Sequence, residues 1–131
     1  MIRTKSVWSP IDRQRDGLRV LATRFRGRGM PATRYDVWLP SLGPSEALLE
    51  GRLTSSWGQF VREYRKELWT DGPIDRRCAT IKNHGQKSLL RLLKHLGRRS
   101  TVTLMCHCDE DQVRCHRHTL KKIIQSSKIK V

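Results

Sequence analysis

The alternation of apolar and polar positions along the chain predicts short strands separated by loops and helices. Strands are expected over 2–8, 18–25 and 101–106, which combine apolar with β-branched residues, and a brief extended piece over 36–40. The second of these is apolar enough to lie inside a sheet. The glycines and proline between 26 and 31 disfavour both helix and strand, so they predict a loop directly after the second strand.

Apolar residues at helical spacing predict the helices. One apolar stripe predicts a helix whose aromatic side chains face the core, and its members are Trp57, Phe60, Val61, Tyr64 and Leu68. Leucines predict a second helix over 88–96, which Gly97 would end. A short helix begins after a Ser45 cap, and a last one is expected over 115–125.

The order of these elements predicts a fold class. Strand, strand, helices, strand and helix fit a small three-layer, Rossmann-like α/β sheet with flanking helices. The length suits a single domain over 1–131, with a basic, frayed tail at 126–131. Ligands of such sheets bind outside the carboxyl ends of the strands. Two loops meet this description, 24–30 after the second strand and 107–118 after the last.

Composition indicates the compartment. No stretch approaches the length of apolar residues that spans a bilayer, and the first residues lead into no apolar signal core. A cytoplasmic protein with no membrane partner is therefore expected. In a reducing compartment the four cysteines are thiols or metal ligands before they are disulfides.

Charge points to a partner. The net charge is +15, and the first 34 residues hold nine Lys or Arg against two Asp. An excess of this size is typical of proteins that bind nucleic acid or nucleotides, although a solvated basic surface is the simpler alternative. Charge says nothing about oligomeric state, which the sequence leaves open.

Several segments together resemble the domain of unknown function 488 family, including its YeaO-like members, and the resemblance covers nearly the whole chain. The matching segments are Thr23-Arg24-Phe25-Arg26-Gly27-Arg28-Gly29, Asp36-Val37-Trp38-Leu39 with Leu42-Gly43-Pro44-Ser45, the helix at 60–68, and Cys115-His116-Arg117 after a strand that ends in Cys. Thr23, Arg26 and Gly27 depart from the family's usual Asp, Trp and Pro. The resemblance implies a compact, bacterial α/β protein with Rossmann-type layering, and it implies no particular reaction or metal.

Three kinds of chemistry compete for the segment 106–118. The first is anion binding, since the start of the last helix offers free amides and Arg117 a bidentate donor. Arg24, Arg26 and Arg28 on the other loop would complete a phosphate or nucleic-acid site. The alternative is that Arg117 only forms an internal salt bridge to Asp109 or Asp111.

The second chemistry is zinc binding. Cys106, Cys108, Cys115 and His118 supply the thiolate and imidazole ligands of a tetrahedral site, although their spacing is not that of a standard zinc knuckle. No cofactor is expected otherwise.

The third is catalysis by Cys115 and His116. A helix N-terminus lowers the pKa of a thiol, which favours Cys115 as the nucleophile. His107-Cys108 and Arg114 also match the pattern of cysteine phosphatases, but Asp109, Glu110 and Asp111 between them would repel phosphate.

The leading hypothesis is a basic α/β domain that holds nucleic acid or a phosphorylated ligand between Arg24, Arg28 and Arg117. The alternatives are a Cys/His-dependent enzyme acting on a small phosphorylated or nucleotide substrate, and a zinc-stabilised interaction module. The sequence does not decide between binding and catalysis.

Overall fold

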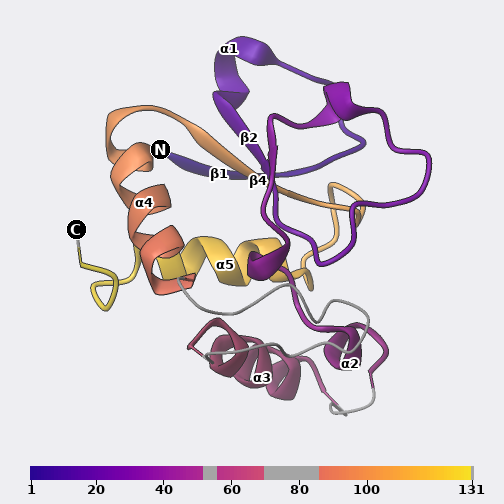
Figure 1. Ribbon diagram of the computed structural model, residues 1–131, viewed down its shortest axis with the longest axis vertical. Helices are drawn as coiled ribbons and strands as arrows, with labels where there is room; N and C mark the ends of the chain where they lie inside the picture. The colour runs from indigo at the N-terminus through magenta and orange to yellow at the C-terminus, as the bar shows by residue number, and fades with distance from the viewer. Residues whose placement is uncertain (52–55, 70–85, 131) are drawn as a thin grey trace.

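A parallel four-stranded sheet forms the centre of the protein, as seen in a computed structural model that describes residues 1–51, 56–69 and 86–130 (Figure 1). The strands are β1 (Ile2–Ser6), β2 (Leu18–Leu21), β3 (Val37–Trp38) and β4 (Val102–Cys106), in the order β1-β4-β2-β3. The helices among the described residues are α1 (Arg13–Asp16), α2 (Glu46–Leu49), α3 (Trp57–Trp69), α4 (Gln86–Arg99) and α5 (His116–Gln125). The expected small three-layer α/β fold is confirmed.

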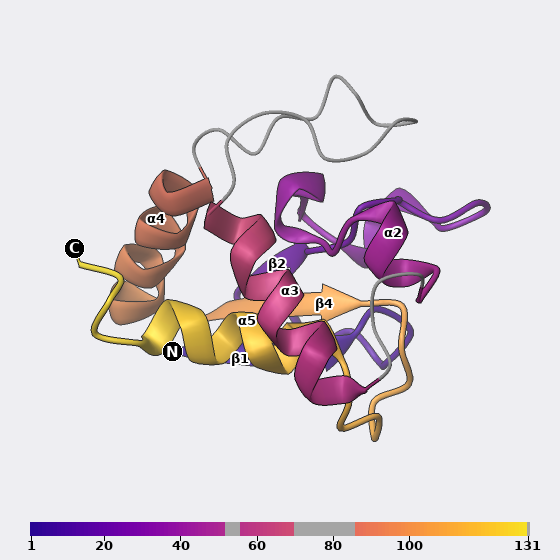
Figure 2. The ribbon, with the colours of Figure 1, turned by 90° about the horizontal axis from the view of Figure 1, so that it is seen from below.

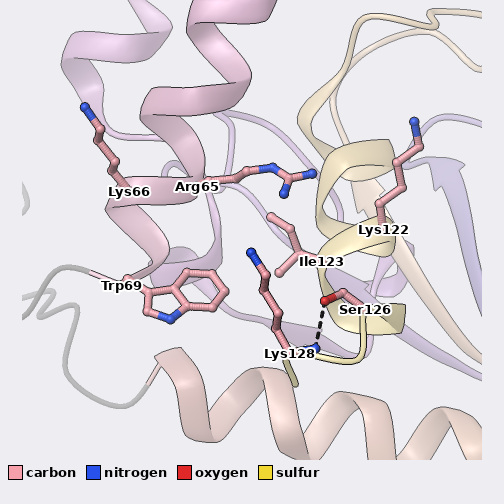
Figure 3. A pocket seen from close by; sticks show the side chains of 7 residues that line it. All are labelled: Arg65, Lys66, Trp69, Lys122, Ile123, Ser126 and Lys128. Atoms are coloured by element: carbon pink, nitrogen blue, oxygen red, sulfur yellow. Dashed lines mark hydrogen bonds between the residues drawn. The ribbon is translucent and has the colours of Figure 1, made fainter. Parts of the chain in front are cut away.

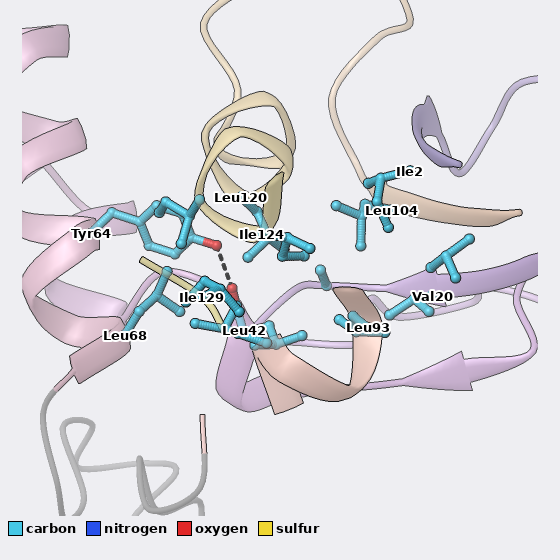
Figure 4. Close-up of a cluster of buried hydrophobic side chains, with 14 of the residues drawn as sticks. Ile2, Val20, Leu42, Tyr64, Leu68, Leu93, Leu104, Leu120, Ile124 and Ile129 are labelled. Carbon is cyan, nitrogen blue, oxygen red and sulfur yellow. Dashed lines mark hydrogen bonds between the residues drawn. The ribbon is translucent and has the colours of Figure 1, made fainter. Parts of the chain in front are cut away.

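The main core lies between the sheet and the longer helices. Figure 2 shows α5 in front of the sheet and running alongside β4, with α3 and α4 beside it. Alternate residues of the strands point into this core, including Val20 and Leu104, and Leu120 and Ile124 meet them from α5 (Figure 4). The Tyr64 hydroxyl donates a hydrogen bond to the Leu42 carbonyl, which ties α3 to the segment before α2.

A smaller apolar cluster lies on the other face of the sheet. The strand residues between those of the main core, Leu21 and Met105, pack there against Val7, Met30 and the partly buried Tyr35. The segment that follows β2 therefore folds back to cover this face, which fixes the loop at 24–30 near the carboxyl end of the sheet.

Two expected element ends are corrected. The second strand ends at Leu21, not Phe25. The backbone of Gly43 packs against the residues that follow this strand, and a β-carbon at position 43 would lie 2.2 Å from the Arg24 nitrogen. Gly97 does not end its helix, which continues to Arg99; a β-carbon at Gly97 would instead lie 2.4 Å from Ile2 Cδ1. Packing, not helix termination, requires a glycine there.

Residues 126–130 of the tail pack against the rest of the fold. Ile129 is buried in the main core, and the Lys94 ammonium donates hydrogen bonds of 2.7 Å to both the Ser126 and Ile129 carbonyls. In the described part of the chain, no helix is long and apolar enough to cross a bilayer.

The turn into β2 depends on Gly17. Its φ of +60° is unfavourable for other residues, and a β-carbon would lie 2.0 Å from the Thr101 carbonyl oxygen. We expect Gly17→Ala to lower the free energy of unfolding by at least about 2 kcal/mol. Gly29 is the control, because it has a φ of +78° but no atom near the added methyl group. Gly29→Ala should lower it by about 1 kcal/mol, and equal losses in urea titrations would contradict the steric argument.

Candidate functional site

The loops after β2 and β4 meet at the carboxyl edge of the sheet, as the sequence predicts. The two strands pair directly, so their carboxyl ends are neighbours. His107 Nε2 lies 3.2 Å from the Phe25 carbonyl oxygen, and a β-carbon at Gly27 would lie 2.7 Å from the His107 ring. A glycine at 27 therefore allows the two loops to pack together.

A pocket of about 150 Å³ lies between these loops and the segment around α2. Phe25, Pro44 and Leu49 give it an apolar wall. Its polar residues include Arg24, Cys106, Cys108 and His116. An apolar cavity of this size can hold one benzene-sized ring.

Two buried thiols meet beside the pocket. Cys106 is the last residue of β4 and points to the same face as Leu104, whereas Cys115 is the N-terminal cap of α5. Their sulfur atoms are 2.9 Å apart, and each residue is at most 2% exposed. Strand and helix thus fix the pair from both sides.

Arg117 holds this pair and the loop together. Its side chain is fully buried, and Nη1 lies 2.8 Å from the Cys106 sulfur but 3.9 Å from that of Cys115. Nη2 donates hydrogen bonds of 3.0 Å to the carbonyls of Asp109 and Glu110. The expected internal pairing thus uses main-chain oxygens, and the nearest paired carboxylate, that of Glu110, is 3.9 Å away.

These contacts place the negative charge on Cys106. The hydrogen bond with Cys115 and the guanidinium of Arg117 lower the pKa of the Cys106 thiol to about 6, although burial opposes them. The same hydrogen bond and burial raise the pKa of Cys115. The helix start therefore does not lower the pKa of Cys115, contrary to the argument from sequence, because Cys115 is the donor to a neighbouring thiolate.

His116 is a neutral imidazole. Burial is the main cause that lowers its pKa, to about 4. Nε2 lies 2.5 Å from the Ala22 carbonyl oxygen, which can only accept, so Nε2 carries the proton. Nδ1 is then an acceptor and lies 3.9 Å from the Cys115 sulfur, while the Tyr64 ring packs edge-on against the imidazole.

Three cysteines form a cluster that could hold a metal ion. The sulfur atoms of Cys106, Cys108 and Cys115 all lie within 4.8 Å of one another. The fourth residue of the predicted zinc set is directed elsewhere: His118 Nε2 lies 3.0 Å from the Gln112 carbonyl and Nδ1 3.4 Å from the Thr4 hydroxyl. Cys78 lies outside the described residues.

The arginines of the β2 loop differ in their surroundings. Arg24 is buried, lines the pocket and donates to the Gly43 carbonyl at 3.0 Å. Arg26 bonds to the Tyr35 hydroxyl and the Met30 carbonyl, and Arg28 is exposed on the same loop. Their predicted role in binding phosphate stays a prediction.

Sequence reasoning did not assign a nucleophilic role to Cys106. It placed Cys106 in the zinc set, because a strand-end cysteine carries no local sign of a lowered pKa. The signal that could have found it is the Arg117 that follows Cys115 by two residues, since one turn of helix directs that side chain back toward the strand end.

These features define a small three-layer α/β protein with two buried thiols and an arginine at the carboxyl edge of a parallel sheet. Residues 2–128 match the family model DUF488-N3a, described as "Active DUF488-N3 subclade", and the chain therefore belongs to the DUF488 family. No curated protein and no solved structure matches the chain.

The neutral state of His116 should make stability depend on pH. The unfolded chain binds a proton at this residue below about pH 6.5, whereas the folded protein binds it only below about pH 4. Stability is therefore lost as the pH falls from 6.5 to 4, by roughly 3 kcal/mol at most. His116→Gln, which keeps a donor for Ala22 but does not titrate, should lose much of this dependence in urea titrations, and an unchanged slope would show that other groups cause it.

Proposed function

We propose that the protein is an enzyme that uses the Cys106 thiolate as a nucleophile toward a small, nucleotide-type substrate. The observation that carries the proposal is the 2.8 Å contact between Arg117 Nη1 and the Cys106 sulfur at the wall of a ring-sized pocket. A buried thiolate needs a cationic partner, and Arg117 supplies one at hydrogen-bonding distance.

The chemistry is a two-step displacement in which the thiol pair balances the protons. The Cys106 sulfur forms a bond to an electrophilic carbon of the substrate while the bond to the leaving group breaks. The leaving group takes the proton of Cys115, which lies next to the reacting sulfur. Water then displaces Cys106 from the carbon and returns a proton to Cys115, so that both residues regain their starting state.

The pocket favours a substrate with a flat ring. Its apolar wall and its volume of about 150 Å³ suit one nucleobase-sized ring. Arg24 adds a positive charge in the pocket, and the exposed Arg28 on the same loop is available to a phosphate outside it. These residues support the substrate class that the sequence suggests.

A clamp in which Arg117 binds an external phosphate directly has less support. Both terminal nitrogens of Arg117 already contact the Cys106 sulfur and the loop carbonyls, and the side chain is fully buried. Arg117 is better suited to hold the thiolate than to bind a ligand from solvent.

Thiol labelling tests the nucleophile. Iodoacetamide should modify Cys106 with a half-maximal rate near pH 6, because its pKa is lowered to about 6. Cys108 should react only at higher pH, since burial raises its pKa. Peptide mapping by mass spectrometry would assign each site, and a Cys106 that reacts like Cys108 would overturn the proposal.

The thiol pair provides a matched pair of variants. Cys115→Ala removes the hydrogen bond that most lowers the pKa of Cys106, so the labelling midpoint should move to higher pH. Cys108→Ala leaves that bond intact and should move the midpoint much less. A midpoint that moves equally in both variants would show that the pair does not control Cys106.

A metal site is the second candidate, favoured by three sulfur atoms within 4.8 Å. Zinc would be held by Cys106, Cys108 and Cys115, and binding would require Arg117 to give up its contact with Cys106. We expect elemental analysis of protein purified without chelator to find much less than one zinc per chain. A ratio near one, lost in Cys108→Ala, would instead establish the metal site and leave no free thiolate.

A further inference from the structure

A second hollow lies away from the thiols, between the end of α3 and the second half of α5. Its volume is about 400 Å³, and it is lined by Arg65, Lys66, Trp69, Lys122, Ile123, Ser126 and Lys128. Figure 3 shows Arg65 reaching across from α3 toward α5, and the Lys128 side chain extending between Trp69 and Ile123. We call this hollow the basic groove.

Among the described residues, Lys66 is the one cation of the basic groove that pairs with a carboxylate. None of the ion pairs among residues 1–51, 56–69 and 86–130 involves Arg65, Lys122 or Lys128. The chain from 116 to 131 contains no Asp or Glu. On α3, Glu63 pairs with Lys66 at 3.3 Å, and Glu67 accepts a hydrogen bond from the Ser45 amide.

The groove also has an aromatic wall and a fixed floor. Trp69 is 38% exposed, although its size favours burial, and Ile123 is buried beneath the cations. Lys94 holds the Ser126 and Ile129 carbonyls at 2.7 Å, and the Lys128 amide donates to the Ser126 hydroxyl at 3.0 Å. The segment that carries Lys128 is therefore held in place on the groove.

We infer that the basic groove binds a single-stranded nucleic acid, with Arg65, Lys122 and Lys128 on its phosphates and Trp69 stacked on a base. Cations that follow a backbone beside an exposed aromatic ring are the combination by which proteins hold single strands. A duplex offers phosphates but keeps its bases stacked inside, so Trp69 would find no partner there. An acidic peptide would use the cations but leave the aromatic wall without a role.

The test is an anisotropy titration of the full chain with a fluorescein-labelled oligothymidine of about 12 nucleotides at several salt concentrations. Arg65→Gln/Lys128→Gln should weaken binding roughly tenfold and make the slope of log K against log salt shallower by about 1.4. Arg13→Gln/Arg91→Gln removes two exposed charges elsewhere and should change both much less. Trp69→Leu should weaken binding roughly tenfold with no change of slope.

Each outcome bears on the groove alone. Equal losses in the two double variants would overturn the groove and leave a generic basic surface. A duplex that competes as well as the single strand, or a Trp69→Leu variant that binds like the wild type, would overturn the stacking. Urea titration of every variant separates lost binding from lost folding. Cys106→Ser should bind normally, so the groove and the thiolate proposal can fail independently.

Discussion

The buried guanidinium of Arg117 is the constraint on which the site depends. A buried cation must be matched by hydrogen bonds and by a negative charge, or the fold is strongly destabilised. Main-chain carbonyls of the loop after β4 accept hydrogen bonds from its terminal nitrogens, and the Cys106 sulfur at 2.8 Å is the closest group that can carry the charge. Arg117 also lies in the first turn of α5, where the helix dipole disfavours a cation, which increases the need for a thiolate.

The same constraint explains why the site is formed mostly by main-chain geometry. The loop from 107 to 114 wraps around one side chain, because three of its carbonyls face that guanidinium. Glu110 fastens the loop from outside, since its carboxylate accepts from the Ser9 hydroxyl and the Ser6 amide at the end of β1. These contacts hold the loop against β1 and the guanidinium beside the thiol pair.

The sequence predicted the fold well and the site in part. The strands and long helices follow from the spacing of apolar residues. The meeting of the two loops follows from the rule that ligand-binding loops lie at the carboxyl ends of the strands. Both depend on local sequence pattern alone. The protonation states of the side chains in the site could not be predicted from the sequence. Cys106 and Cys115 differ in pKa because they share a hydrogen bond and because Arg117 lies nearer to Cys106, and no linear spacing records a difference between 2.8 and 3.9 Å. The basic groove was missed for a similar reason, because Trp69 and Lys128 belong to separate segments.

Helix α5 connects the thiol site with the basic groove, and the charges of these two sites lie at opposite ends of the helix. Its first turn meets the thiols, and seven residues later, roughly 10 Å along the axis, Ile123 forms the floor of the basic groove. Helix α3 also runs from the thiol site to the basic groove, since Tyr64 packs on His116 and Trp69 lies beside Ile123. The exposed Lys122 on the last turn of α5 lies near the negative end of the helix dipole, so its charge stabilises the helix. The buried cation of Arg117 at the other end has no such support from the dipole, and this difference favours the thiolate proposed at one end and the polyanion proposed at the other.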